Sequence, residues 1–523
     1  YQFVCIFYCF LVILNNIFIQ IADSNDEEDF HPHLKSLPAD DVLKNPKELV
    51  GDYWKFQAQS YIGSKLNKPP NKSKTAKNII MFLGDGMSIH TVTATRTFIK
   101  GESTKLSFEE FPFFGLSKTY CVNTQVADSA CTATAYLSGV KGNYGTIGVN
   151  ANVPRYHCTK GADNSTFTEG IAKWAQDAGK ATGIVTTARV THASPAGIYA
   201  HTANRNWEND EEIGKNNCSS NVNTDIARQL VHWSVGKGLN VVLGGGRANF
   251  RDKNIKDEQG NSGRRMDKKD LIQEWLKDRT TRGNAAYVWN KEGLLSVDTK
   301  KTDYLLGLFS PDHCSFHGDL KRNGLEKTEP TLTEMTEIAI KLLQEKNEGF
   351  FLFVEGARID MAHHETKARK ALEDTEEFSN AVRRAKELTS EDDTLIVVTS
   401  DHSHTMTING YPARGNDILG LSGNKGSDDL PYTTLSYANG LGYYNTFSGK
   451  GPRRDLSQDN FKDADYRYMA TVPLSSETHG GEDVGVFAIG PRSELFSGNY
   501  EQTSIPLMMA YAGKIGPYTN EKD

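Results

Sequence analysis

Six short apolar runs rich in β-branched residues constrain the fold of this chain more than any other feature. They lie at residues 78–83, 182–187, 240–243, 350–354, 394–399 and 484–489. Segments with helical periodicity, such as 333–344 and 368–388, lie between them. Such runs are typical of strands buried on both faces, and their alternation with helices is the βαβ pattern. We therefore predict the α/β class, with a doubly wound, mostly parallel central sheet and helices on both faces.

The chain divides into segments of different composition. Residues 1–22 carry no charge and are mostly apolar, which predicts a secretory signal, incomplete because the sequence begins with Tyr1; an anchor helix is the alternative. We expect a linker at 23–45, one large domain at 46–515 and a polar tail at 516–523. Residues 410–475 are rich in Gly, Asn, Tyr and Ser, which indicates a loop-rich insertion.

Net charge and hydrophobic content exclude two classes of protein. The formal charge is -7, so no basic surface is expected and nucleic acid is an unsuitable partner. Hydrophobic residues make up 38% and charged residues 24%, which excludes a body that crosses the membrane several times. A small or surface-borne substrate fits better.

The cysteines and glycosylation sequons are those of an exported protein. Cys158 and Cys218 lie in polar, Asn-rich segments, and we expect them to form a disulfide. Cys131 lies in a run of small residues and is expected to be buried. Sequons at Asn71 and Asn164 predict N-glycosylation.

Polar side chains follow four of the apolar runs, near the point where each predicted strand ends. They are Asp85, then His192 and Ser194, then Glu355, and then Asp401 and His402. Parallel strands bring their carboxyl ends to one edge of a sheet, where ligands bind. A polar turn would explain any one of these groups, but four in succession favour a shared metal or catalytic site.

A second set of candidate ligands lies just after Glu355. Asp360 and His364 are four residues apart and would face the same way on a helix, although solvated imidazoles are the alternative for His363 and His364. Aspartate with histidine suits zinc, whereas carboxylates with a hydroxyl suit magnesium. Ser129 opens an apparent helix, where it acts either as a cap or, beside a metal ion, as a nucleophile.

Short motifs recur along the chain in an order that is specific to one family. They are Gly84-Asp85-Gly86-Met87, Asp128-Ser129-Ala130, His192-Ala193-Ser194-Pro195, His201-Thr202-Ala203-Asn204-Arg205, Val354-Glu355-Gly356, Arg358-Ile359-Asp360, Asp401-His402-Ser403-His404 and Glu477-Thr478-His479-Gly480. From about residue 45 to its end, the chain resembles the animal alkaline phosphatases of the membrane-bound type. The resemblance implies that family's fold, with residues 410–475 as a crown-like insertion.

The resemblance implies hydrolysis of phosphate monoesters through a phosphoserine, with broad specificity, at the extracellular face. Ser129 would be the nucleophile and Arg205 would grip phosphate. Two Zn²⁺ and one Mg²⁺ are implied. The implied ligands are Asp360, His364 and His479 for the first zinc, Asp85, Asp401 and His402 for the second, and Asp85, Ser194 and Glu355 for magnesium, with His192 and His404 supporting them from behind.

Two positions depart from the family's pattern. Met361 stands where vertebrate relatives usually have a histidine directed at phosphate, and Ser310 stands where they usually have a glutamate that binds calcium. Glu329, with Asp257 or Glu258, remains available for Ca²⁺, so that site stays open.

The resemblance also implies a homodimer, and attachment to the cell surface by a glycolipid anchor. Two alternatives remain at this point. A phosphodiesterase or sulfatase of the same superfamily is the first, although the Cys/Ser-x-Pro-x-Arg pattern of sulfatases is missing around Ser129. A surface binding protein without catalytic activity is the second.

Overall fold

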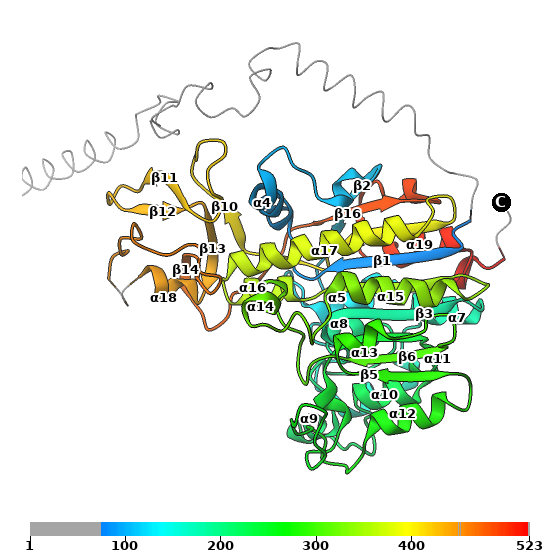
Figure 1. Ribbon diagram of the computed structural model, residues 1–523. Helices are drawn as coiled ribbons and strands as arrows, with labels where there is room; N and C mark the ends of the chain where they lie inside the picture. Colours follow the sequence, from blue (N-terminus) through cyan, green and yellow to red (C-terminus); the bar gives the residue numbers. More distant parts are fainter. Residues whose placement is uncertain (1–74, 448, 450, 521–523) are drawn as a thin grey trace, which may run out of the picture.

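The computed structural model describes residues 75–447, 449 and 451–520, and a ten-stranded sheet runs through its centre (Figure 1). The strand order is β17-β2-β16-β8-β1-β7-β3-β4-β6-β5. Every neighbouring pair is parallel except the two pairs made by β16. The strands are β1 (Asn78–Gly84), β2 (Phe113–Lys118), β3 (Ala181–Arg189), β4 (Val241–Gly245), β5 (Ala285–Val288), β6 (Tyr304–Leu308), β7 (Phe350–Gly356), β8 (Thr394–Thr399), β16 (Val484–Ile489) and β17 (Gly498–Glu501). The predicted fold class is confirmed.

The six predicted runs are β1, β3, β4, β7, β8 and β16. The other four strands of the central sheet were not predicted from the sequence. Of these, β2, β5 and β17 are only partly buried, so they lack the continuous apolar run that marks a central strand. The sixth run, β16, is antiparallel to its neighbour β8. The chain returns from β8 to β16 without a crossover helix packed on the sheet, which allows the reversed direction.

Helices cover both faces of the sheet, each over its own apolar cluster. Along β1, Ile79 and Met81 belong to one cluster and Ile80 and Phe82 to the other, as the alternation of a strand requires. The predicted segments 333–344 and 368–388 are α15 and α17 on the second face (Figure 1). Thr331 and Glu334 form a capping box that starts α15.

The longer helices are α4 (Ile89–Lys100), α5 (Ser129–Ser138), α7 (Ile171–Asp177), α10 (Ile226–His232), α12 (Leu271–Arg279), α15 (Leu332–Gln344), α16 (Arg358–His364), α17 (Ala368–Leu388) and α19 (Ser504–Gly513). The shorter ones are α6 (Cys158–Gly161), α8 (Ala193–Ala196), α9 (Asp210–Lys215), α11 (Ser234–Gly238), α13 (Lys291–Leu295), α14 (His317–Arg322) and α18 (Gly442–Thr446). Among the described residues, no helix combines the length and the apolar composition that crossing a membrane requires.

The predicted insertion contains more regular structure than its composition indicated. One three-stranded sheet joins β10 (Met406–Ile408), β13 (Leu435–Gly440) and β14 (Ala470–Pro473), and a hairpin joins β11 (Leu421–Lys425) to β12 (Pro431–Thr433). Leu435, Tyr437 and Tyr468 belong to a separate apolar cluster. In Figure 1 these strands lie at one end of the main sheet. In this small core, Tyr437 and Tyr468 pack with aliphatic side chains that include Leu372, Ile418, Leu419 and Leu435.

Two disulfides lie in the described part of the chain. One joins Cys158 to Cys218, the pair expected from the sequence, across 60 residues; the other joins Cys121 to Cys131, across 10. Cys131 is buried, as predicted, but its bond to Cys121 was not foreseen. Chain entropy gives about 4 kcal/mol for the longer loop and about 3 kcal/mol for the shorter.

Several sequence predictions fall at the ends of the chain. The signal, the linker and Asn71 lie outside the described residues. Asn164 is exposed and begins a short 3-10 turn, Asn164–Thr166, so its side chain is accessible to modification. The tail begins with another such turn, Gly516–Tyr518.

We predict that Asp374→Asn stabilises the protein in alkaline solution. Asp374 is 6% exposed on α17, where burial raises the pKa of its carboxyl to about 8, and its Oδ2 accepts the His317 N–H at 3.1 Å. Because the folded-state pKa lies above the unfolded value, wild-type stability falls between about pH 4 and pH 8. Asparagine does not titrate.

The advantage of the variant should therefore grow with pH, to on the order of a few kcal/mol at pH 8. Thermal unfolding of both proteins at pH 5 and pH 8 measures it. An equal difference at the two pH values would contradict the assignment.

Candidate metal and catalytic site

The side chains that follow the strands gather at one edge of the sheet. The strands β8, β1, β7 and β3 are consecutive neighbours, and all four run in the same direction. Their carboxyl ends carry the residues predicted from the sequence. Gly86, just after β1, has φ 66°, and a Cβ there would lie 2.4 Å from the His404 ring. Glycine is therefore required where the chain passes through the site.

Asp85, Asp401 and His402 form the first group, and Ser129 lies beside it. His402 Nε2 lies 3.6 Å from Asp85 Oδ1 and 3.2 Å from Asp401 Oδ2. The Ser129 hydroxyl lies 3.2 Å from the same Nε2. All of these side chains are at most 1% exposed. The Gly86 N–H donates to Asp401 Oδ1 at 3.0 Å, which holds that carboxylate in place. One buried point is thus surrounded by two carboxylates, an imidazole and a hydroxyl.

Three carboxylate oxygens at this edge are buried and accept no hydrogen bond. They are Asp85 Oδ1, Asp401 Oδ2 and Glu355 Oε1. Burial and the charge of Asp401 raise the pKa of Asp85 well above its usual range. Burial, with the charge of a neighbouring aspartate, raises the pKa of Asp401 to about 6, and burial raises that of Glu355 to about 7. Orphaned oxygens among crowded acids fit bound cations.

Glu355 and Ser194 lie on the other side of Asp85. The Ser194 hydroxyl donates to Asp85 Oδ2 at 3.3 Å. Thr186, on β3, donates its hydroxyl to Glu355 Oε2 and so orients that carboxylate. This set consists of oxygen donors alone, which is the chemistry that magnesium prefers.

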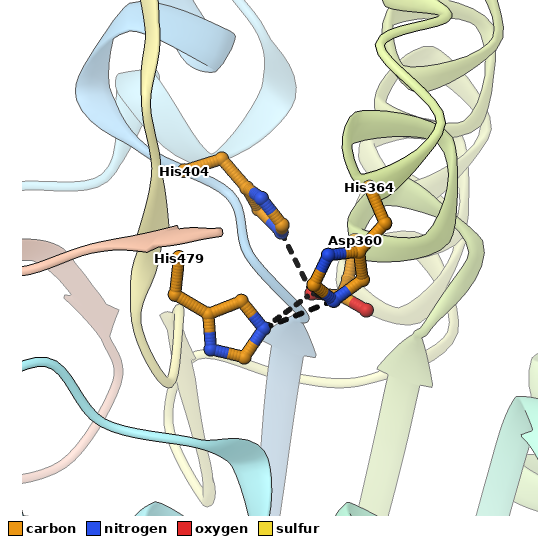
Figure 2. A group of neighbouring side chains, drawn as sticks. All are labelled: Asp360, His364, His404 and His479. Carbon is orange, nitrogen blue, oxygen red and sulfur yellow. Dashed lines mark hydrogen bonds and ion pairs between the residues drawn. The ribbon is translucent and has the colours of Figure 1, made fainter. Parts of the chain in front are cut away.

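Asp360, His364 and His479 converge in a second group (Figure 2). Asp360 and His364 lie on α16, one turn apart as predicted, with Asp360 Oδ1 3.4 Å from His364 Nε2. His479, on β15 (His479–Gly480), brings its Nε2 within 3.3 Å of the same oxygen and 3.1 Å of His364 Nε2. The nitrogens and the carboxylate face one another, as zinc ligands do.

His404 lies behind this group, on β9 (Ser403–His404), which pairs with β15. Its Nε2 lies 2.6 Å from Asp360 Oδ1, and its Nδ1 donates to Glu477. Burial opposes its charge, but Glu477 and Asp360 raise the pKa of His404 to about 10. Because both ring nitrogens are engaged by carboxylates, His404 orients Asp360 rather than offering a ligand atom of its own.

Arg205 and Ser129 are brought together by Asp128. The Asp128 side chain caps α5, and its Oδ2 accepts from Arg205 Nη1 at 2.9 Å. Arg205 Nη2 also donates to His192 Nε2 at 3.2 Å. Burial and the charge of Arg205 lower the pKa of His192 well below its usual range, so this ring is a neutral acceptor. The guanidinium is therefore fixed from two sides, next to the amino end of α5.

Met361, one of the two departures from the expected pattern, lies beside an arginine. Met361 Sδ lies 2.8 Å from Arg358 Nη1, so this side chain contacts the arginine. Asp257 is paired with Arg247 and Glu258 with Arg251. These two ion pairs give no support to the calcium site that the sequence left open.

Comparison with known proteins identifies the family. A family model described as alkaline phosphatase matches residues 76–515, which is most of the chain. The chain belongs to the alkaline phosphatase family. The membrane-bound alkaline phosphatase of Bombyx mori is 45% identical over 94% of this chain and 90% of that protein. The tissue-nonspecific alkaline phosphatase of Homo sapiens is 44% identical over 90% of each chain.

Solved structures agree with the fold. The alkaline phosphatase of the Antarctic bacterium TAB5 superimposes with a TM-score of 0.57, at 23% identity, over 84% of this chain and 99% of that one. The Thermus thermophilus alkaline phosphatase gives a TM-score of 0.59 at 21% identity, over 86% and 93%. The present chain, as a member of this family, is a metal-dependent enzyme that hydrolyses phosphate monoesters.

Three residues make supporting contacts that the sequence did not predict. Asp128 holds Arg205, Glu477 holds His404 and the His364 Nδ1 through its backbone oxygen, and the Ala127 carbonyl accepts the His479 Nδ1–H at 2.7 Å. Asp128 directly precedes Ser129 and Glu477 lies two residues before His479, so closeness in sequence to a predicted site residue was the available signal. A backbone carbonyl leaves no such signal.

Metal removal should destabilise the fold, because it leaves the orphaned carboxylates crowded without cations. We expect a chelator to lower the midpoint of thermal unfolding by several degrees. This corresponds to on the order of 4 kcal/mol when the free cation concentration is far above the Kd of the cation. Zinc with magnesium should restore it. Calorimetry of treated and reconstituted protein checks this. An unchanged midpoint in fully metal-free protein would contradict the cation requirement.

Proposed function

We propose that the enzyme acts through a phosphoserine on Ser129, with Arg205 holding the phosphoryl oxygens. The observation that supports this most is the position of the Ser129 hydroxyl, buried at the amino end of α5 and 3.2 Å from His402 Nε2. The positive end of the helix favours an alkoxide and an incoming phosphate. Arg205, anchored by Asp128, directs its planar fork to the same place.

The proposed reaction has two displacements. In the first, the Ser129 oxygen forms a bond to phosphorus while the ester oxygen leaves as the alcohol. In the second, the oxygen of water attacks phosphorus while the bond between phosphorus and the Ser129 oxygen breaks; inorganic phosphate is released, and the Ser129 oxygen takes a proton from that water. Arg205 balances charge on the phosphoryl oxygens in both steps. His192 holds the guanidinium in one orientation throughout.

We propose two zinc ions and one magnesium ion as the resident metals. The first zinc is assigned to Asp360, His364 and His479, the second to Asp85, Asp401 and His402, and magnesium to Asp85, Ser194 and Glu355. Bound at these positions, the ions supply positive charge that lowers the pKa of hydroxyl groups and stabilises departing oxyanions. The orphaned carboxylate oxygens and the donor types in each set support the assignment.

Broad specificity follows from where the proposed contacts fall. Ser129, Arg205 and the metal groups all address the phosphoryl group, so little of the leaving alcohol is read. The phosphodiesterase, sulfatase and binding-protein alternatives lose support, since the family match is long and every expected catalytic side chain is present.

Replacing the nucleophile tests this mechanism. We expect Ser129→Ala to lower kcat by at least about a thousandfold while zinc content stays at the wild-type value, because the hydroxyl oxygen that bonds to phosphorus is gone. Ser138→Ala, which removes a hydroxyl at the far end of the same helix, should keep near-normal kcat. Acid-quenched wild-type enzyme should carry phosphate on Ser129 by mass spectrometry. Full activity in Ser129→Ala would refute the mechanism.

We further propose that the enzyme is a homodimer held at the outer cell surface by a glycolipid anchor. The disulfides suit an oxidising compartment, and the Bombyx mori relative is membrane-bound by name. Phosphatidylinositol-specific phospholipase C should release the native activity from cells. Light scattering of the released protein should give roughly twice the mass of one chain. Activity that stays with the cells would contradict the glycolipid anchor, and the mass of a single chain would contradict the homodimer.

A further inference from the structure

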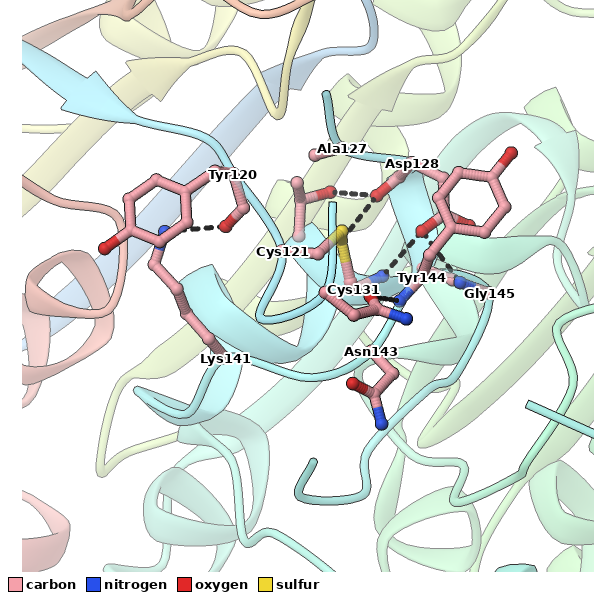
Figure 3. Close-up of a disulfide and its surroundings, with 12 residues drawn as sticks. Tyr120, Cys121, Ala127, Asp128, Cys131, Lys141, Asn143, Tyr144 and Gly145 are labelled. Atoms are coloured by element: carbon pink, nitrogen blue, oxygen red, sulfur yellow. Dashed lines mark hydrogen bonds between the residues drawn. A yellow bond between two sulfur atoms is a disulfide. The ribbon is translucent and has the colours of Figure 1, made fainter. Parts of the chain in front are cut away.

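The Cys121–Cys131 disulfide (Figure 3) lies at the start of α5, the helix that begins with Ser129. Cys131 is in the first turn of α5, two residues after Ser129, and Cys121 begins the loop that leads back to that helix. Each cysteine is 2% exposed, and both pack with Ala127 in a small buried cluster. A stabilising cross-link could have been placed anywhere on the surface, whereas this one is buried next to the reaction centre.

The loop 121–127 is held at its beginning by the segment that follows α5. The Val122 N–H donates to the Gly142 carbonyl at 3.1 Å, and Asn123 Oδ1 accepts the Tyr144 N–H at 2.9 Å. Lys141 Nζ donates to the Tyr120 carbonyl at 2.7 Å (Figure 3). At the far end of the loop, the disulfide cluster confines Ala127.

Ala127 orients His479. Its carbonyl accepts the His479 Nδ1–H at 2.7 Å, across 352 positions of sequence. With the proton fixed on Nδ1, the lone pair of Nε2 points to Asp360 and His364, at 3.3 and 3.1 Å. Partners that hold the second nitrogen of a ligating histidine set both ring orientation and metal affinity.

The residue after Ala127 serves the other half of the site. Asp128 Oδ1 accepts the N–H groups of Cys131 and Gly145, at 3.2 and 2.9 Å (Figure 3). Its Oδ2 accepts from Arg205. The disulfide therefore contacts both of the adjacent residues that orient His479 and Arg205: it packs against Ala127, and the N–H of Cys131 donates to Asp128. The sulfurs are bonded to each other, so this cluster offers no thiolate to a metal.

We propose that the Cys121–Cys131 disulfide is a positioning element that sets the zinc affinity of the Asp360, His364 and His479 group. It does so by confining the Ala127 carbonyl, and through it the His479 ring. The inference rests on the proposed function in one respect, since it takes His479 as a zinc ligand. A disulfide that added stability alone would leave zinc affinity untouched.

The chain supplies a matched control. Cys158–Cys218 closes the longer loop, so its removal should lower global stability more than removal of Cys121–Cys131. Cys218 packs in an apolar cluster with Trp207 and Ile213, and none of the zinc-group residues belongs to that cluster. The control variant therefore separates the two effects. It should lower global stability more than the test variant does, and it should leave zinc affinity unchanged.

The test compares zinc affinity in the two double variants, measured by chelator competition starting from the holoenzyme. In Cys121→Ala/Cys131→Ala, affinity at the zinc position assigned to Asp360, His364 and His479 should fall about tenfold or more. In Cys158→Ala/Cys218→Ala, it should stay within about twofold of wild type, although the thermal midpoint falls further. Unchanged affinity in the first variant, or an equal fall in both, would overturn the proposal.

Two further variants keep the result interpretable. His479→Ala tests the ligand assignment itself: wild-type zinc affinity there would refute the proposed function, whereas a loss there with no change in the disulfide variant refutes only the positioning role. If the first double variant does not fold, Ala127→Gly loosens the carbonyl with the disulfide intact. Its zinc affinity should fall several-fold, and wild-type affinity would overturn the proposal.

Discussion

The structure depends on the crowding of buried carboxylates at the carboxyl edge of its sheet. Asp85, Glu355, Asp360 and Asp401 are each at most 4% exposed, and several of their oxygens have no proton donor. Like charges in a dry interior repel strongly and lose their hydration, so such an arrangement persists only when cations or imidazolium groups balance it. Folding and metal binding are therefore expected to be coupled at the proposed metal positions.

The orientation of the site comes from groups that do no chemistry. Hydrogen bonds to Glu477 and the Ala127 carbonyl orient histidine rings. Asp128 orients an arginine, and Thr186 orients a glutamate. Each acts by hydrogen bonding to an atom facing away from the reaction centre. The catalytic constellation is consequently only as rigid as the loops that carry these supports, and the disulfide at residue 121 stiffens one of them.

Much of the fold and the site could be predicted because both follow from local sequence patterns: apolar runs that form strands, and the polar residues that come directly after them. Strands such as β1 and β7 are buried on both faces, so they are continuous apolar runs, and the rule for parallel sheets then places Asp85 and Glu355 together. The edge strands β5 and β17 are half exposed and carry no such signal. The contact between His479 and Ala127 spans 352 residues and involves a backbone oxygen, which no periodicity encodes.

Because β16 lies antiparallel beside β8, the long segment between them connects two neighbouring strands of the sheet. The two strands are adjacent in the sheet and separated in sequence by residues 400–483, so that whole segment is, topologically, the loop of one β-hairpin. Its two ends carry His402 and His479, whose rings stack with centroids 3.5 Å apart. The small sheets of the insertion sit beyond that stacked pair. As the tip of a hairpin, these sheets can differ in length and surface without moving the strands β8 and β16 that flank His402 and His479.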